Sequence, residues 1–301
     1  MTARRSAASV LARLLEVAKQ RGEDYSLLLN RFGLERLLDR LTKSRHADRF
    51  LLKGALLFWL WYDEPHRPTR DADLLGFGPD DAGHLAAVFR EIASVELDDG
   101  IVFAPDSVRV DPIREDNVYG GSRVRLVGHV GKARCSLQVD VAFGDAVTPG
   151  PETASYPVLL PDFERPTLRV YPVYTVIAEK YQAMVMLGGA NSRMKDFYDL
   201  HMIACRTSLD GQTLARAIAA TFTRRATTIP AEPPLALRTL FAADPAKRQQ
   251  WRAFLSRNRL LQLELADAIE LLYFLLWPPT QVAGSASDAS AKWDSVLLRW
   301  V

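Results

Sequence analysis

Two aspartates that stand two residues apart, Asp71 and Asp73, lie in the short segment TRDADLLGF. The segment alternates polar and apolar residues, which predicts a β-strand. Residues two apart on a strand point to the same face, so the two carboxylates would lie side by side. Such a pair repels itself unless it binds a divalent cation or faces bulk water. The apolar neighbours favour a central strand, where the pair would be a candidate metal site; the alternative is a pair of turn or edge-strand aspartates.

A third carboxylate, Asp140, lies in the apolar segment RCSLQVDVAF at residues 134–143, which also predicts a strand. A buried, unpaired carboxylate would be costly there, so this position also calls for a charged partner. Three carboxylates on adjacent strands would form a hard-oxygen site that suits Mg²⁺ and phosphate.

Cationic side chains follow on two predicted helices. Lys180 lies in VIAEKYQAM, within an apolar stripe, where a lysine can present a compact cation to a phosphate; the alternative is a snorkelling or salt-bridged surface lysine. In RMKDFYDL, Arg193 and Asp196 share a helix face, as do Lys195 and Asp199. Taken alone, this segment also fits a charged helix start with local ion pairs.

The order of these motifs resembles a known family. KGAL, TRDADL, VDV, AEKYQAM and RMKDFYDL occur in this sequence over roughly residues 50–200. In this order they resemble the AbiEii/AbiGii nucleotidyltransferase toxins of the polymerase-β-like nucleotidyltransferase superfamily, and they are similar to the MenT toxins of that group. The resemblance implies an α/β (α+β) fold, with a mixed sheet and flanking helices followed by an α-helical domain.

The resemblance also implies roles for individual residues. Asp71, Asp73, Lys180 and Asp196 would be catalytic, and Asp140 would join the two strand aspartates as a metal ligand. The nucleotide-binding residues would be Gly54, Thr69, Lys180, Arg193 and Lys195. One departure is Ala55, which follows Gly54 where the superfamily usually carries a hydroxyl residue; the hydroxyl of Thr69 is a candidate substitute.

The function implied by the resemblance is that of a toxin in a toxin–antitoxin system. The enzyme would use Mg²⁺ (or Mn²⁺) and transfer nucleotides from an NTP to the 3′ end of tRNA, which would block translation. A cognate antitoxin protein would be its partner. The alternatives are transfer to a protein or small-molecule acceptor, a non-catalytic nucleotide- or RNA-binding relative, and a helical protein–protein module.

The remaining periodicity predicts the elements that position these residues. A buried helix is expected over 48–62, broken at Gly54, with a strand as the alternative. Further predicted helices are 6–21, 25–41, 81–95, 174–188, 193–206, 210–223 and 247–276, and further strands are 101–111 and 122–130. We predict a catalytic domain over 1–165 with the N-terminal helices, and an α-helical domain over 166–301 that completes the active site. The Pro-rich segment 145–166 would link them.

Composition excludes several classes of protein. The 301 residues are 48% hydrophobic and 25% charged, which is typical of globular proteins. The formal net charge of +2 conceals blocks: residues 1–60 hold 12 Lys and Arg against 6 Asp and Glu, residues 70–165 hold 9 against 17, and residues 193–260 hold 12 against 5. We expect an RNA backbone to lie along the two basic blocks.

Two isolated cysteines predict no disulfide framework. The absence of a signal sequence or an 18-residue apolar run predicts a cytoplasmic protein with no membrane partner.

Overall fold

The computed structural model describes residues 5–62, 67–113, 120–285 and 290–301. The chain forms two compact units, which we describe separately. The first comprises Met1–Gly144 and Glu152–Tyr171, and the second comprises Asp145–Pro151 and Pro172–Val301. The main junction between the units therefore lies at Tyr171 and Pro172, and the division at 165/166 stays a prediction.

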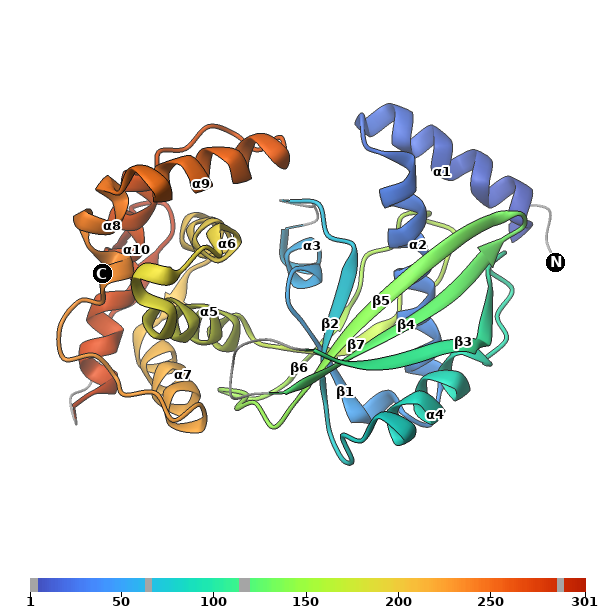
Figure 1. The fold of residues 1–301 in the computed structure, drawn as a ribbon, viewed down its shortest axis with the longest axis horizontal. Coiled ribbons are helices and arrows are strands. Elements are labelled where there is room, and N and C mark those ends of the chain that lie inside the picture. The colour runs from blue at the N-terminus through green and yellow to red at the C-terminus, as the bar shows by residue number, and fades with distance from the viewer. Residues whose placement is uncertain (1–4, 63–66, 114–119, 286–289) are drawn as a thin grey trace. The chain divides into compact units, whose positions relative to one another are not determined.

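The first unit is built on a seven-stranded mixed sheet in the order β3-β4-β5-β2-β1-β7-β6 (Figure 1). Its strands are β1 (Phe50–Lys53), β2 (Asp71–Gly76), β3 (Val102–Ile113), β4 (Gly121–Val130), β5 (Ala133–Phe143), β6 (Glu152–Ser155) and β7 (Thr167–Val170). β2 runs parallel to β5, and β1 runs parallel to β7, while the other neighbours are antiparallel. Predicted strands 69–77, 101–111, 122–130 and 134–143 are thus confirmed.

Among its described residues, the α-helices of this unit are α1 (Ala7–Arg21), α2 (Tyr25–Lys43), α3 (Leu56–Tyr62) and α4 (Ala82–Ala93). The side chains of Ser6, Asp24 and Asp81 cap α1, α2 and α4 by accepting backbone N–H bonds. Helices α2 and α4 cover one face of the sheet, where their leucines, Phe89 and Ile92 meet Ala72, Leu74 and Val139. The other residues of β2 and β5, which alternate with these, therefore point to the opposite face.

A close approach between α2 and β5 depends on a glycine. A Cβ atom added to Gly33 would lie 2.9 Å from Cδ2 of Leu137 and 3.5 Å from Cβ of Cys135. The Cys135 thiol is also 3.7 Å from the Leu29 carbonyl oxygen. The first half of α2 is therefore held directly against strand β5, on the face of the sheet opposite Asp140.

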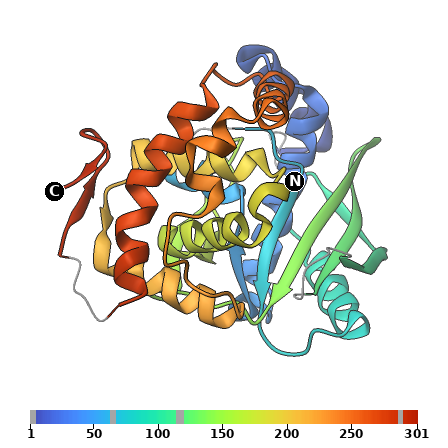
Figure 2. The ribbon, with the colours of Figure 1, turned by 60° about the vertical axis from the view of Figure 1, so that its left-hand side comes forward.

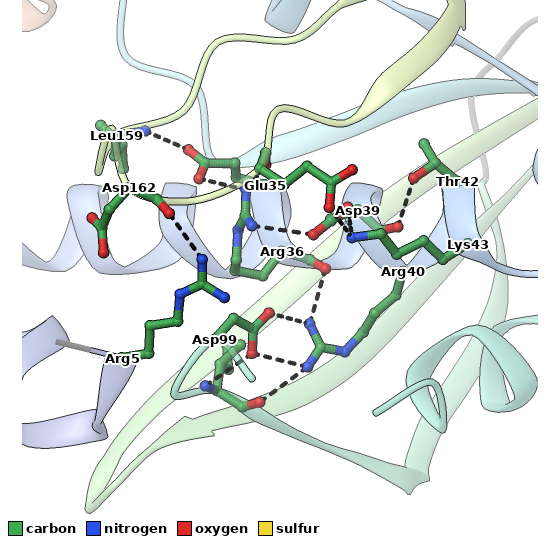
Figure 3. A network of polar contacts seen from close by, with 12 residues as sticks. Arg5, Glu35, Arg36, Asp39, Arg40, Thr42, Lys43, Asp99, Leu159 and Asp162 are labelled. Carbon is green, nitrogen blue, oxygen red and sulfur yellow. Dashed lines mark hydrogen bonds and ion pairs between the residues drawn. The ribbon is translucent and has the colours of Figure 1, made fainter. Parts of the chain in front are cut away.

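A buried network of charges fastens α2 to the loops around it (Figure 3). Arg40 donates through both terminal nitrogens to Asp99, at 2.6 and 3.1 Å, and also to the Ile101 carbonyl oxygen. Arg36 bridges Glu35 and Asp39 along the helix. These side chains are at most 4% exposed, so each charge depends on its partner.

Glu35 connects this network to the chain that leads into β7. Its Oε2 accepts a hydrogen bond from the Leu159 backbone N–H at 2.8 Å. Burial raises the pKa of the Glu35 carboxyl, and the Arg36 guanidinium opposes that shift only in part. Helix α2 is thereby tied both to the loop before β3, through Asp99, and to the loop around residues 156–164.

The second unit is mainly helical (Figure 2). Its helices are α5 (Val173–Leu187), α6 (Met194–Arg206), α7 (Gly211–Arg224), α8 (Thr239–Ala243), α9 (Pro245–Arg257) and α10 (Leu265–Ala283). α10 packs against α6 and α7, and α5 packs against α7. Strands β8 (Leu209–Asp210), β9 (Lys292–Asp294) and β10 (Arg299–Trp300) form a small antiparallel sheet, anchored by the fully buried Trp293.

Three predicted elements differ from the structure. The apolar run 48–62 is a strand, β1, up to Lys53 and a helix only from Leu56, because β1 is inserted between β2 and β7. The predicted helix 247–276 is two helices, separated at residues 258–264, where Arg259 has a positive φ of 55°. The Pro-rich segment 145–166 contributes the edge strand β6. Within the part of the chain that the structure describes, no helix is long and apolar enough to cross a membrane.

Candidate functional site

A row of charged residues crosses four neighbouring strands of the large sheet. Lys53 of β1 pairs with Asp73 of β2, Asp73 pairs with Asp140 of β5, and Asp140 pairs with Arg123 of β4. Residues that are directly opposite each other on neighbouring strands point to the same face. The register therefore places two carboxylates side by side at the centre of the row, with a cation at either end.

Asp71 extends this group along β2. Its burial alternates with that of its neighbours: Ala72 and Leu74 are buried against the helices, while Asp71 and Asp73 are partly exposed. Asp71 pairs with Gln138 of β5 and thus lies two residues from Asp73 on the same face. The three predicted strand carboxylates therefore share the face of the sheet that points away from α2 and α4.

Gly54 lies in direct contact with Asp73. A Cβ atom at this position would be only 2.0 Å from Oδ2 of Asp73, and the backbone has a positive φ of 72°. Both observations exclude any side chain without a shift of the carboxylate. Gly54 is thus required by the position of Asp73, which explains in steric terms why a glycine stands between β1 and α3.

Asp140 is held by a guanidinium group. Arg123 donates from Nε to Oδ1 at 2.9 Å and from Nη2 to Oδ2 at 2.7 Å, in a two-pronged ion pair between β4 and β5. Both carboxylate oxygens are therefore engaged. Asp140 remains beside Asp73, but a metal ion bound there would have to share Asp140 with Arg123.

Asp71 and Asp73 fit a magnesium ion better than the three carboxylates together do. Mg²⁺ in nucleotide-transferring proteins is usually held by one or two carboxylates together with substrate phosphates. Two adjacent carboxylates on one strand face supply that donor set. Among the described residues, no group of three or more His, Cys, Asp or Glu side chains is arranged as a preformed metal site, and the use of Mg²⁺ or Mn²⁺ stays a prediction.

Thr69, the candidate hydroxyl donor, precedes β2 by two residues and is partly buried. Its Oγ1 is 3.5 Å from Nη1 of Arg67, a contact at the outer limit for a hydrogen bond. The structure thus places the hydroxyl beside a cation at the entrance to β2, in the same unit as Gly54 and the strand carboxylates.

The second unit carries the remaining predicted residues, gathered around Lys180 of α5. The Lys180 ammonium donates to Oδ1 of Asp196 and to Oδ2 of Asp199, each at 2.7 Å, and both aspartates lie on α6. Arg193 donates from Nε to the second oxygen of Asp196, also at 2.7 Å. Lys180 is thus both the predicted phosphate-binding candidate and a salt-bridged lysine, and its ammonium has a fixed position.

Asp196 is almost fully buried, with a side chain 1% exposed, and both its oxygens are engaged by cations. Burial alone would raise the pKa of this carboxyl. The charges of Lys180 and Arg193 outweigh burial, so the pKa of Asp196 lies below its ordinary value. Asp196 thus fixes the positions of the two cations, and its predicted catalytic role stays a prediction.

The start of α6 holds Arg193 in place. The Asn191 side-chain oxygen accepts a hydrogen bond from the Arg193 backbone N–H at 2.8 Å, and the buried Lys247 ammonium donates to the Asn191 carbonyl oxygen at 2.8 Å. The Arg193 side chain is 36% exposed, and Lys195 is exposed. Of the predicted residues at or near the start of α6, these two are the most exposed and can reach a ligand most directly.

Sequence reasoning missed several members of both clusters. Asp199 was considered only as a partner of Lys195, although it lies three residues after Asp196 and therefore shares its helix face. The spacing in RMKDFYDL could have identified it. Arg123 and Lys53 carried no comparable signal, because their roles depend on strand register, which the sequence does not reveal.

Comparison with known proteins identifies a family whose model covers the residues of both clusters. A family model described as "Nucleotidyl transferase AbiEii toxin, Type IV TA system" matches residues 36–271. The mixed sheet with flanking helices is consistent with a nucleotidyltransferase fold, so the predicted fold class is confirmed. Among curated proteins, none matches the chain significantly.

Two solved structures from Helicobacter pylori are similar at 16% sequence identity. JHP933 has a TM-score of 0.47, and the match covers 85% of this chain and 91% of that one. A provisionally assigned nucleotidyltransferase has a TM-score of 0.48, with 86% and 97% covered. Because both TM-scores are below 0.5, neither similarity bears on the function.

Proposed function

The chain belongs to the AbiEii nucleotidyltransferase toxin family of type IV toxin–antitoxin systems, and from this premise we propose that it transfers nucleotides from an NTP to the 3′ end of tRNA. Membership implies a cognate antitoxin as partner. Extension of the 3′ end would prevent aminoacylation and stop translation. The observation that supports this proposal best is the grouping of Asp71, Asp73 and Asp140 on one face of two parallel strands.

The proposed reaction is a substitution at phosphorus. The oxygen of the acceptor hydroxyl forms a bond to the α-phosphorus of the NTP. The bond from that phosphorus to the oxygen bridging the β-phosphate breaks, and pyrophosphate leaves. The hydroxyl proton passes to a carboxylate oxygen of Asp73 or Asp140, which lie next to each other in the sheet register.

Each cluster contributes to binding the substrate in this scheme. Asp71 and Asp73 would hold Mg²⁺. A bound Mg²⁺ would neutralise the negative charge that develops at the transferred phosphate. Gly54 leaves room for the Asp73 carboxylate. Lys180 would pair with the β- and γ-phosphates, and its ammonium is held in one orientation by Asp196 and Asp199.

Helix α9 is the best candidate for contact with the RNA backbone. The segment from Pro245 to Leu263 contains five Lys and Arg residues and no Asp or Glu. Four of the five are exposed, namely Arg248, Arg252, Arg257 and Arg259, and the fifth, Lys247, is buried. Within the described part of the chain, none of these four arginines forms an ion pair. Their charges are available to phosphates.

The other basic block, residues 1–60, is less suitable than its charge suggests. Arg36 and Arg40 are buried in ion pairs with Asp39 and Asp99. Exposed cations such as Arg45 are paired as well, in this case with Glu91. Of the two basic blocks, we therefore propose only the second, residues 193–260, as a surface for the RNA backbone.

The deciding experiment incubates the purified full chain with total tRNA, Mg²⁺ and each α-labelled NTP in turn. We expect label to enter the tRNA band with at least one NTP, and transfer to stop when EDTA is added. Asp71→Ala should lower the rate by about a hundredfold or more, because several kcal/mol of charge stabilisation depend on a bound metal. The exposed Asp80, which lies outside β2, provides the control variant Asp80→Ala with wild-type activity.

The same assay separates the alternatives. Label that enters a protein band or a small molecule from a cell lysate, and never tRNA, identifies a different acceptor. Metal-dependent NTP binding without transfer identifies a non-catalytic relative, an outcome that Ala55 would favour. Absence of transfer with every NTP, or equal transfer by Asp71→Ala, contradicts the proposal.

A further inference from the structure

A polar pocket of about 430 Å³ lies beside Asp71, within the first unit. It is formed by the first turns of α2, the start of β2 and the start of β5. Its polar lining includes Ser26, Asn30, Arg70, Asp71, Arg134 and Gln138. The pocket is therefore continuous with the carboxylate face, since Asp71 and its strand partner Gln138 belong to both.

The pocket exists because β5 begins before its parallel neighbour β2. The pairing of β2 with β5 starts at Asp71 opposite Gln138, whereas β5 itself starts at Ala133. Alongside this early part of β5 lies α2, whose Asn30 side chain donates from Nδ2 to the Ser136 carbonyl oxygen at 2.8 Å. The walls are thus a helix and two strands, which hold the lining residues at fixed positions.

The lining has the chemistry of a nucleotide site. The lining contains two arginines, Arg70 and Arg134, and one carboxylate, Asp71, so the guanidinium groups can pair with an anion such as a phosphate. The Oδ1 atom of Asn30 is buried and accepts no hydrogen bond from any residue that the structure describes. It can accept one from the exocyclic amino group or ring N–H of a base. The volume lies in the range of small-ligand pockets.

The position of the pocket distinguishes an acceptor nucleotide from the incoming NTP. Gly54 lies on the β1 side of Asp73, whereas the pocket lies at the starts of β2 and β5. Because Gly54 is a predicted nucleotide-binding residue, we place the NTP of the proposed function on the Gly54 side. The opposite side of the carboxylate pair is then the place for the group that attacks it.

We propose that this pocket holds the terminal nucleotide of the RNA acceptor strand, with its phosphate against Arg70 and Arg134 and its base against Asn30. The inference rests on the proposed function, because it names the acceptor subsite of that reaction. It makes Arg134 and Ser26 determinants of acceptor binding rather than of NTP binding.

The test compares three single variants of the full chain. Arg134→Ala removes an exposed cation of the lining, and Ser26→Trp fills the pocket from an exposed helix position. Lys132→Ala removes an exposed cation two residues from Arg134 that does not line the pocket. Loss of a charge-assisted hydrogen bond corresponds to about a tenfold change, so the KM for tRNA should rise about tenfold in Arg134→Ala. Ser26→Trp should raise the KM for tRNA at least as much, because the indole ring occupies the space of the nucleotide. The KM for the NTP should not change, and Lys132→Ala should match the wild type.

A KM for the NTP that rises together with that for tRNA would show that the pocket holds the incoming nucleotide and would overturn the inference. Unchanged KM values in all three variants would overturn it too.

If the wild-type chain transfers nothing, the proposed function fails, but the subsite is still tested by binding of a short fluorescent RNA with a free 3′ hydroxyl. Its Kd should rise about tenfold in Arg134→Ala and Ser26→Trp and stay constant in Lys132→Ala; equal Kd values in all variants contradict the subsite.

Discussion

Individual atoms at the junction of β1 and α3 set the position of the central carboxylate. Gly54 leaves a space that Oδ2 of Asp73 occupies, 2.0 Å from where a Cβ would be. The carboxylate is thus confined on one side by backbone, and on the other by Asp140 in the strand register. Its location is fixed by sterics before any ligand binds.

Gly54→Ala should therefore abolish most activity with only a modest loss of stability. The new methyl group must displace the Asp73 carboxylate, and a misplacement of about 1 Å can lower a rate by about a hundredfold. The left-handed backbone adds a cost of about 1–2 kcal/mol in free energy of unfolding. Nucleotide transfer and thermal unfolding of the variant measure the two effects separately.

Gly22→Ala is the matched control for that substitution. Gly22 has a similar φ of 64°, but a Cβ there meets nothing within 4 Å. Both variants should lose similar stability, and only Gly54→Ala should lose activity. Equal activity in the two variants would show that the contact with Asp73 does not matter for catalysis.

At the scale of elements, α2 supports the face of the sheet opposite the carboxylates. Its buried charged side chains connect it to two loops: Arg40 donates to Asp99 in the loop before β3, and Glu35 accepts a hydrogen bond from the Leu159 backbone N–H (Figure 3). The same helix contributes Ser26 and Asn30 to the pocket beside Asp71. Loosening α2 should therefore affect both the stability of the first unit and the shape of that pocket.

Asp99→Ala should destabilise the first unit by about 3–5 kcal/mol, because it leaves the Arg40 guanidinium buried without its charged partner. The control is the double variant Arg40→Met with Asp99→Leu, which replaces the pair by apolar side chains and should be nearly neutral. Hydrogen exchange of peptides from β4 and β5 reports on this unit alone. Equal protection in Asp99→Ala and the wild type would contradict the assigned role of the pair.

The elements show what sequence reasoning could predict. The alternation of TRDADL was sufficient to place Asp71 and Asp73 on one strand face, because that inference needs only the period of a strand. The strand at Phe50–Lys53 was predicted as part of a helix, since a short apolar run has no period that distinguishes the two. Partners distant in sequence, such as Arg123 for Asp140 and Asp99 for Arg40, depend on the tertiary fold and could not be inferred.

At the scale of the whole molecule, the formal net charge of +2 conceals charges with different uses. Many of the cations in residues 1–60 are neutralised inside the first unit, as Arg36 and Arg40 are. In the second unit, the exposed arginines of α9, namely Arg248, Arg252 and Arg257, project from a helix with no acidic residue. Exposure and pairing, rather than the count of charges, therefore indicate which surface attracts a polyanion.

The double variant Arg248→Ala with Arg252→Ala should weaken tRNA binding and make it less sensitive to salt. The two arginines are one helical turn apart on α9 and both are exposed, so one RNA strand can contact both. Each phosphate contact that is lost should reduce the slope of log K against log salt concentration by about 1. Fluorescence anisotropy of labelled tRNA over a range of KCl concentrations measures the slope.

Arg45→Ala is the control variant, because it removes an exposed arginine of the first unit that is already paired, and its slope should equal that of the wild type. If the α9 variant retains the wild-type slope but is no longer neutralised by the antitoxin, then α9 binds the acidic surface of that protein, and the RNA path must lie elsewhere.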